Sequence, residues 1–294
     1  MSSFHLSRFA VLASLLIALL LANTASAALL LYEPFDYTGT DIDGQSSSTE
    51  QGLSGTWSGN VTVPESGTSG GFGTQGTMSI DDTASLSHPG VAGTPVGGRL
   101  ADSDAGTAER SLDGFSIDMN GTNTYYVSGL FKGISNYVQF EGTSGGADYV
   151  RTVFGTTTEG GFILGQRNNP SNYVTGTTYD GGSKTFDPDT TYLLTMKIVC
   201  GANDQYSLKI FDPTMWIDAT EPVAWDYTDT DQSGVNLTRL FIGRLSDSGE
   251  VDELRVGTQW SDVITPSVPE PGTAMLLLIG SVAGTALLRR RYRV

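Results

Sequence analysis

The chain has 294 residues, of which 32 are acidic and 16 are basic, so its formal net charge is −16. Proteins that bind nucleic acid or anionic lipid need clusters of cationic side chains, so this balance excludes both functions for the body of the chain. Cys200 is the single cysteine, and no internal disulfide can form. The fold must therefore rest on a hydrophobic core.

The first 27 residues have the pattern of a cleaved signal peptide. Arg8 gives a weak positive charge, residues 9–22 form an apolar run, and Ala25 and Ala27 occupy the small-residue positions of a cleavage site. Cleavage after Ala27 leaves Ala28 as the first mature residue. The pattern predicts export across the inner membrane.

Residues 28–264 predict one large all-β domain, which can reach roughly 200–250 residues. This part carries 11 basic and 31 acidic residues, a formal charge of −20. Gly-rich and Ser/Thr-rich turns separate short runs of aromatic and β-branched residues, a pattern typical of a β-sandwich. The clearest predicted strands are Tyr125–Phe131, Tyr137–Phe140, Tyr149–Phe154, Phe162–Leu164, Tyr192–Cys200, Tyr206–Phe211 and Leu237–Leu245.

Other segments of the domain predict turns or edges. Residues 46–59 and 66–76 are expected to be loops or weak edge strands, and residues 202–205 are expected to close a hairpin with Tyr206, Leu208 and Ile210 alternating on its second strand. Cys200 ends an alternating apolar run, which predicts a small buried side chain without redox chemistry.

Trp216 and Trp225 lie in a loop-like stretch, residues 212–234. Saccharide sites stack a sugar ring on an exposed aromatic side chain that polar groups flank. We therefore consider both tryptophans as stacking platforms, although most tryptophans of a sandwich serve in packing. If either one binds a glycan, the partner would be an extracellular polysaccharide.

The acidic turn beside these tryptophans could bind calcium. Asp229, Asp231 and Ser233 place oxygen ligands at alternate positions, and Gly234 follows at the sixth position, as in the first half of a calcium loop. Leu240 stands where an EF-hand carries its bidentate glutamate, so the turn is not an EF-hand. The plain alternative is an acidic surface turn, and no cofactor is certain.

The last expected strand, residues 249–257, combines apolar and charged positions. We expect Leu254 and Val256 to point into the core, and Asp252, Glu253 and Arg255 to face water or a neighbouring strand.

The chain also resembles the concanavalin A-like and laminin-G-like jelly rolls. The resemblance extends over residues 31–263 and is carried by residues 31–37, 191–194, 249–257 and 258–263. It implies an antiparallel jelly-roll sandwich of two sheets with roughly six or seven strands each, in which the first and last strands are adjacent. Laminin-G-like domains often bind calcium through loop acids, so the resemblance also supports the calcium hypothesis.

The same superfamily includes glycoside hydrolases with the motif Glu-x-Asp-x-x-Glu on one strand. Here Glu250 and Asp252 match the first two positions, but Arg255 occupies the third, and a guanidinium cannot exchange a proton near neutral pH. His88 is the only histidine beyond the signal peptide, and no nucleophile motif surrounds any serine. The sequence therefore predicts a protein without catalytic residues.

The C-terminus has three ordered parts. Residues 265–272 form a linker that contains Val268, Pro269, Glu270 and Pro271; residues 273–288 form an apolar span; and residues 289–294 form a basic cytoplasmic tail. The span predicts a transmembrane helix of ~24 Å, which is short for a hydrocarbon core of ~30 Å. The tail arginines, which stop transfer across the bilayer, are Arg289, Arg290, Arg291 and Arg293.

At residues 268–293 the chain resembles the PEP-CTERM sorting signal of Gram-negative bacteria. The resemblance implies that an exosortase, a membrane protease-transpeptidase, recognises Pro269, Glu270 and Pro271 as its substrate. It also implies an initial inner-membrane anchor, later display at the cell surface or in the extracellular matrix, and a link to exopolysaccharide and biofilm production.

Three functional classes remain open. The first is a non-enzymatic, C-terminally sorted protein of the cell envelope or extracellular matrix. The second is a calcium-dependent, lectin-like carbohydrate-binding module with the same destination. The third is a degenerate glycoside hydrolase, which would need two carboxyl groups ~5–10 Å apart in a cleft.

Overall fold

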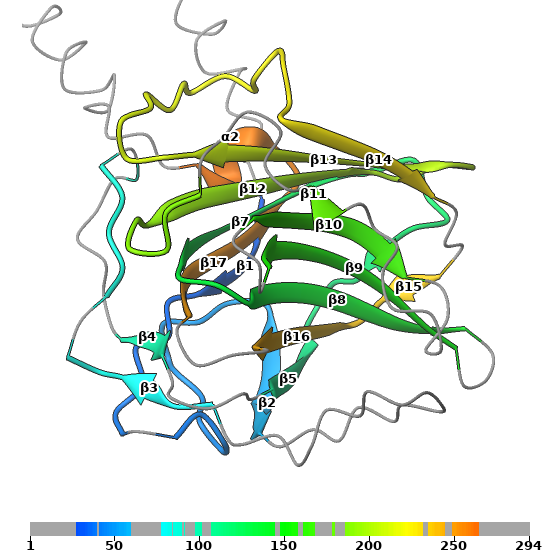
Figure 1. Cartoon of the computed structure of the whole chain (residues 1–294). Coiled ribbons are helices and arrows are strands. Elements are labelled where there is room, and N and C mark those ends of the chain that lie inside the picture. Colours follow the sequence, from blue (N-terminus) through cyan, green and yellow to red (C-terminus); the bar gives the residue numbers. More distant parts are fainter. Residues whose placement is uncertain are drawn as a thin grey trace, which may run out of the picture.

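The computed structural model describes residues 28–264 except for gaps at 40, 60–77, 84, 90, 92–97, 102–106, 145–147, 158–160, 168–177, 180–185, 232–234 and 245–248. Within these residues the regular structure is β-strand apart from one four-residue helix, α2 (Trp260–Val263), so the all-β prediction is confirmed. Figure 1 shows the strands arranged in two layers. The predicted signal peptide, linker, apolar span and arginines lie outside the described residues, and among the described residues no helix is long and apolar enough to cross a membrane.

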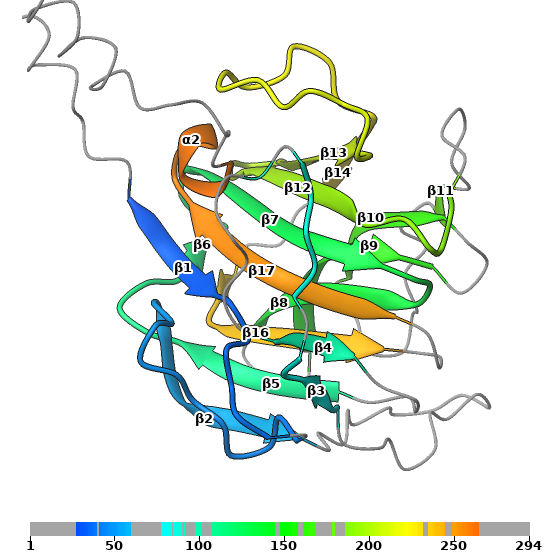
Figure 2. The same cartoon turned by 90° about the vertical axis from the view of Figure 1, so that its left-hand side faces the viewer.

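The first layer is an eight-stranded antiparallel sheet. Its order is β14 (Tyr227–Asp231), β13 (Asp204–Phe211), β12 (Tyr192–Val199), β7 (Thr124–Lys132), β17 (Glu250–Gly257), β4 (Arg99–Ala101) and β3 (Ile80–Asp81), with β1 (Leu29–Glu33) also paired to β17. β4 and β1 pair with successive parts of β17. Figure 2 shows β1 beside β17, so the first and last strands are adjacent, as predicted.

The second layer is a seven-stranded antiparallel sheet, which a two-stranded ladder accompanies. Its order is β11 (Thr178–Tyr179), β10 (Phe162–Arg167), β9 (Asp148–Thr156), β8 (Asn136–Ser144), β16 (Arg239–Arg244), β5 (Thr107–Leu112) and β2 (Leu53–Gly59), and the ladder joins β6 (Ile117–Asp118) to β15 (Asn236–Leu237). All seven predicted strands are present, the last one divided between β15 and β16. Residues 53–59 form the edge strand β2, which agrees with the weak edge expected there, while residues 66–76 lie outside the described part.

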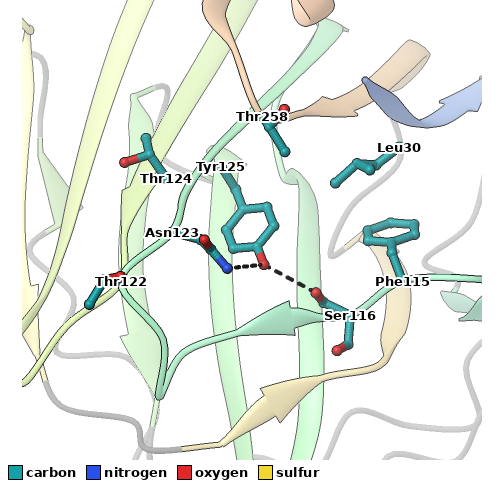
Figure 3. A pocket seen from close by; sticks show the side chains of 8 residues that line it. All are labelled: Leu30, Phe115, Ser116, Thr122, Asn123, Thr124, Tyr125 and Thr258. Atoms are coloured by element: carbon teal, nitrogen blue, oxygen red, sulfur yellow. Dashed lines mark hydrogen bonds between the residues drawn. The ribbon is translucent and has the colours of Figure 1, made fainter. Parts of the chain in front are cut away.

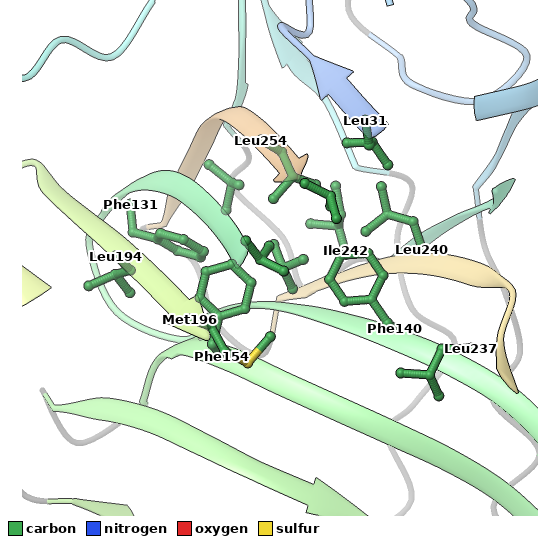
Figure 4. Close-up of a cluster of buried hydrophobic side chains, with 14 of the residues drawn as sticks. Leu31, Phe131, Phe140, Phe154, Leu194, Met196, Leu237, Leu240, Ile242 and Leu254 are labelled. Atoms are coloured by element: carbon green, nitrogen blue, oxygen red, sulfur yellow. The ribbon is translucent and has the colours of Figure 1, made fainter. Parts of the chain in front are cut away.

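The main hydrophobic core fills the space between the two sheets. Alternate residues of each strand point into it, as expected for side chains that alternate along a pleated strand. Figure 4 shows part of this core, with Leu194, Met196, Phe140 and Phe154 facing one another from the two sheets. Burial of each such side chain contributes roughly 1.5–3 kcal/mol to the free energy of unfolding, so the core compensates for the absence of disulfides.

The β12–β13 hairpin agrees with the sequence. Tyr206, Leu208 and Ile210 alternate into the core, and the turn is closed by the Asp204 carboxylate, which accepts a hydrogen bond from the Gly201 N–H at 3.0 Å. Cys200 is buried, and burial raises the pKa of its thiol to about 12. The thiol therefore stays protonated, which confirms the expected structural role.

A smaller apolar cluster covers the outer face of the eight-stranded sheet. Strand residues of that face pack against helix α2 and against the loop between β13 and β14, residues 212–226. The cluster consists of Leu86, Tyr126, Leu130, Leu193, Phe211, Ile217, Trp260, Val263 and Ile264. One face of this sheet thus meets the core, and the other is partly covered by a second apolar layer.

A β-bulge interrupts strand β17. Glu253 has a positive φ of 52°, and the ladder with β7 shifts between Asp252 and Arg255, so the chain gains one residue there. Leu254 and Val256 point into the core, as predicted. Asp252 and Glu253 are both buried. Glu253 accepts a hydrogen bond from Tyr32 on the neighbouring strand β1, which agrees with the prediction, whereas Asp252 accepts one from the backbone of the loop residue Leu86, which was not predicted.

Candidate functional site

The loop of residues 212–226 carries one open aromatic platform. It joins β13 to β14 and runs as the yellow segment beside α2 in Figure 1. Asx-type turns shape it, because the Asp212 carboxylate accepts the Thr214 N–H at 2.8 Å and the Asp218 carboxylate accepts the Thr220 N–H at 3.0 Å. Trp216 is 75 % exposed on this loop, so its ring is available to a ligand.

The second predicted tryptophan, Trp225, packs against the protein. Its ring meets Trp260 edge to face at 6.0 Å between centroids. The Lys197 ammonium lies 6.0 Å from the Trp225 ring centre and pairs with Glu221, whose other carboxylate oxygen accepts a hydrogen bond from the Tyr126 hydroxyl at 2.6 Å. These contacts fasten the loop to the sheet and leave Trp216 as the member of the predicted pair that projects outward.

The predicted calcium ligands fall partly on a strand. Asp229 and Asp231 belong to β14, the edge strand that pairs with β13, and the Asp229 carboxylate accepts a hydrogen bond from the Thr230 N–H at 2.8 Å. Ser233 lies outside the described residues. In the described part of the chain, no group of three or more His, Cys, Asp or Glu side chains has the spacing of a metal site. Calcium binding therefore stays a prediction.

The motif positions of the hydrolase hypothesis share the outer face of β17 but are occupied by other interactions. Glu250 forms an ion pair with Arg99 at 3.3 Å. Asp252 accepts hydrogen bonds from the N–H groups of Leu86 and Glu253 at 2.8 Å each, and burial raises the pKa of its carboxyl well above the usual range. Arg255, in the third position, pairs with Glu253 at 2.9 Å.

His88 is also part of the packing. It is buried, its Nε2 lies 3.2 Å from the Phe211 carbonyl oxygen, and burial lowers its pKa.

A charged cluster on the outer face of the seven-stranded sheet was not anticipated. The Arg239 guanidinium on β16 bridges Glu109 on β5 and Glu141 on β8, with N–O distances of 3.1 Å to each. Gln139 donates a hydrogen bond to Glu141 at 3.1 Å. We call Glu109, Glu141 and Arg239 the outer cluster.

A second cluster with the same composition is buried on the opposite side of β5. Arg110 makes a bidentate pair with Glu50 and lies 3.8 Å from the carboxylate of Glu33. The Tyr37 hydroxyl donates to Glu33 at 2.5 Å and accepts from Trp57 Nε1 at 2.7 Å. Burial raises the pKa of the Glu33 carboxyl to about 7, although the hydrogen bonds from Tyr37 and Phe35 oppose the shift. We call Glu33, Glu50 and Arg110 the inner cluster.

The sequence holds little signal for either cluster. Their members are separated by up to 130 residues, and no spacing along the chain relates them. The local clue is the pair Glu109–Arg110 within a short strand, since adjacent strand residues face opposite sides and the strand must therefore place one charge inside. Such a charge requires a buried partner.

The most specific match to known proteins lies at the C-terminus. Residues 267–291 match the family model described as the PEP-CTERM protein-sorting motif, which confirms the predicted sorting signal. No curated protein matches the chain.

Solved structures resemble the chain at low sequence identity. The Trypanosoma (T. cruzi) calreticulin globular domain is 11 % identical, with 80 % of this chain and 90 % of that chain covered and a TM-score of 0.43. An endo-1,3-beta-glucanase from Streptomyces sioyaensis is 11 % identical, with 80 % and 97 % covered and a TM-score of 0.37. A lectin from Bauhinia forficata is 10 % identical, with 78 % and 98 % covered and a TM-score of 0.35.

Proposed function

We propose that this protein, whose chain carries a PEP-CTERM protein-sorting motif, is a non-enzymatic component of the cell surface or extracellular matrix of a Gram-negative bacterium. In this proposal an exosortase recognises the motif while the apolar span holds the chain in the inner membrane. The β-sandwich is the part that the cell delivers. An association with exopolysaccharide and biofilm belongs to the same proposal, through the resemblance to the sorting family.

The position of the motif relative to the fold carries this proposal. The described fold ends at Ile264, directly after helix α2, and the matched motif begins at residue 267. A cut within the motif would therefore separate the apolar span from the sandwich without breaking any described strand. The order of folded domain, motif and span is the one that a processed anchor requires.

The geometry of β17 supports the non-enzymatic part of the proposal. A retaining or inverting glycosidase needs one carboxyl group to donate a proton and another to act as nucleophile or base beside the same bond. On this strand Asp252 is buried beneath Leu86, Glu250 is paired with Arg99, and Arg255 stands where the third acid would be.

The test uses the full chain with an epitope tag after Val294, expressed in a host that has an exosortase. The parent chain should lose the tag and move from the membrane fraction to the surface or medium. The combined variant Pro269→Ala, Glu270→Ala, Pro271→Ala should keep the tag and stay in the membrane, as should the parent in an exosortase deletion strain. Pro266→Ala, which removes a proline just outside the matched residues, is the matched control and should behave as the parent. Unchanged processing of the triple variant would refute the proposal.

Calcium-dependent carbohydrate binding is the second candidate function. The exposure of Trp216 favours it, because a large aromatic ring that is left open on a fastened loop offers a surface for a sugar ring. Affinity electrophoresis in gels that contain bacterial exopolysaccharide, with and without a calcium chelator, tests it. The parent should be retarded and Trp216→Ala should be retarded less, whereas Val223→Ala, which removes another exposed apolar side chain of the same loop, should keep the full retardation. Equal mobility of parent and Trp216→Ala would contradict this candidate, and retardation that the chelator leaves unchanged would remove its calcium requirement.

A further inference from the structure

A surface pocket of about 460 Å³ lies at one end of the sandwich. Its lining residues are Leu30, Phe115, Ser116, Thr122, Asn123, Thr124, Tyr125 and Thr258. They come from β1, from the segments before and after β6, from the start of β7 and from the residue that follows β17. No residue of the loop 212–226 is among them, so this pocket is separate from the predicted stacking site.

The walls of the pocket are held in place by the core. Tyr125 is buried in the main core, and Leu30 and Phe115 pack against that core. Figure 3 shows the Tyr125 ring in the centre, with Asn123 on one side and with Phe115 and Leu30 on the other. The Asn123 carbonyl oxygen accepts a hydrogen bond from the Cys200 N–H at 2.9 Å, which fixes the turn that carries its side chain. The pocket is therefore preformed.

The lining has a mixed but uncharged character. Two aromatic rings and one leucine provide apolar surface, while four hydroxyl side chains and one amide provide hydrogen-bond donors and acceptors. Among the described residues that line the pocket, none carries a charge. Contacts of 3.4 Å join the Tyr125 hydroxyl to the Ser116 carbonyl, to the Asp118 N–H and to the Asn123 amide. The exposed Asn123 amide can exchange this weak hydrogen bond for one to a better-placed ligand group.

These properties define the chemistry of a fitting ligand. A wholly apolar ligand would strip water from the hydroxyl and amide groups without replacing their hydrogen bonds. An anionic ligand would find no cation in the lining and would approach a strongly acidic protein. A pyranose ring meets both halves of the lining, because its C–H face is apolar and its rim carries hydroxyl groups. The volume lies within the range of roughly 300–1,000 Å³ that small-ligand sites occupy.

We propose that this pocket binds an uncharged, polyhydroxylated ring, as presented by a neutral saccharide. The half-buried Phe115 ring and Leu30 side chain contact the apolar face of the sugar, and the exposed Asn123 amide and the neighbouring hydroxyl groups bind its rim. This proposal rests on carbohydrate binding, the second candidate function above, and adds to it a second binding site and a class of sugar. It does not depend on whether an exosortase processes the C-terminus.

The experiment uses the full chain in a polyoxyethylene detergent, which carries no sugar headgroup. Saturation-transfer NMR and titration calorimetry measure binding of maltohexaose, cellohexaose, xylohexaose and mannohexaose, with hexagalacturonate as the anionic counterpart. We expect at least one neutral hexasaccharide to bind and hexagalacturonate not to bind. Asn123→Ala should weaken the binding by about three- to tenfold through loss of a hydrogen bond, and Phe115→Ala by at least as much.

Two controls separate this pocket from the rest of the surface. Asn120→Ala removes the same type of side chain from the same turn outside the pocket, and Trp216→Ala removes the stacking platform of the loop; neither should change the affinity. Asn123 is exposed, so its variant should fold, and an unchanged melting temperature checks this. Binding that is lost in Trp216→Ala but kept in Asn123→Ala would overturn the proposal and leave the loop as the sugar site. Absence of binding by all four neutral sugars, or binding of hexagalacturonate alone, would also overturn it, while the sorting test would be unaffected.

Discussion

The inner and outer clusters are built from the same parts but in opposite environments. Each consists of one arginine between two glutamates, and strand β5 supplies one member to each through the consecutive residues Glu109 and Arg110. The Arg110 side chain is 1 % exposed, whereas that of Arg239 is 27 % exposed. Water can therefore stabilise the outer arginine without its partners, and the inner arginine depends on its partners entirely. The comparison shows that the burial of the arginine, more than the ion pair itself, decides how strongly the fold depends on each cluster.

The inner cluster also links segments that are distant in the chain. Arg110 donates to the backbone carbonyl of Gly55 at 2.5 Å as well as to Glu50, and the Tyr37 hydroxyl connects Glu33 to Trp57. The cluster therefore attaches the N-terminal segment to strands β2 and β5. The outer cluster joins β5, β16 and β8, which are already neighbours in one sheet, so it adds little to the connectivity of the fold.

Arg110→Ala should have the largest effect on stability. Removal of one partner leaves the carboxylates of the inner cluster buried without compensation, which costs about 3–5 kcal/mol of the free energy of unfolding. Chemical denaturation followed by tryptophan fluorescence measures this, because Trp57 contacts Glu33 and Arg110 of the cluster. A loss below about 1 kcal/mol would show that the two clusters do not differ as described.

The Glu33 carboxyl should make stability depend on pH. The pKa of this carboxyl is raised from its ordinary value of 4.5 to about 7 in the folded state. Between these two pH values the folded protein therefore binds one proton that the unfolded chain has released. The contribution of this group to the free energy of unfolding is therefore fully present below about pH 4.5 and decreases as the pH rises. Once the pH passes 7, the free energy of unfolding is lower by on the order of 3 kcal/mol. The difference between the parent and Glu33→Gln, measured by denaturation from pH 4 to 8, isolates the effect, because a neutral amide does not titrate. A pH-independent difference would contradict the assignment.

Tyr37→Phe should have an intermediate effect. Its hydroxyl is the donor to Glu33 and the acceptor for the Trp57 indole, so its loss leaves two buried polar groups with weaker partners. We expect a loss of about 1–3 kcal/mol, measured by the same denaturation. Tyr137→Phe, on the outer face of the seven-stranded sheet, is the control and should change stability by less than the inner variant. A loss in Tyr37→Phe no greater than in this control would show that the Tyr37 hydroxyl does not support the inner cluster.

Arg239→Ala should have the smallest effect. Its ion pair with Glu109 is partly exposed, and such pairs contribute roughly 0–1 kcal/mol, while the buried Glu141 keeps its hydrogen bond from Gln139. The difference from the parent should also shrink in 1 M NaCl, where the Debye length falls to about 3 Å, whereas the effect of Arg110→Ala should persist. Denaturation at low and high salt checks both statements. A large loss of unfolding free energy that does not change with salt would show that Arg239 depends on its partners as Arg110 does.

Much of the fold could be predicted because alternation is a local signal. The β12–β13 hairpin follows from residues 192–211 alone, and burial of Cys200 follows from its place in that pattern. The burial of Asp252 could not be predicted, because its hydrogen-bond partner Leu86 lies 166 positions away along the chain. Trp216 and Trp225 look equivalent in the sequence, and packing against Trp260 separates them.

The candidate sites were predictable to different degrees. The sorting signal is a linear motif, so the sequence alone identified it, and the family comparison confirmed it. The neutral pocket is assembled from residues between 30 and 258, and none of them stands out in composition. Such a site becomes visible only when the first strand and the last strand meet.

The place of β17 in the sheet has a consequence for folding during export. This last strand pairs with β7 on one side and with β4 and β1 on the other, so the centre of the sheet is completed only after residue 257 has left the translocation channel. The segment from Ile264 to the start of the apolar span reaches roughly 30 Å when extended. A chain that pauses at that span can thus insert its final strand beside the bilayer as a single molecule, before its open sheet edges meet those of another copy.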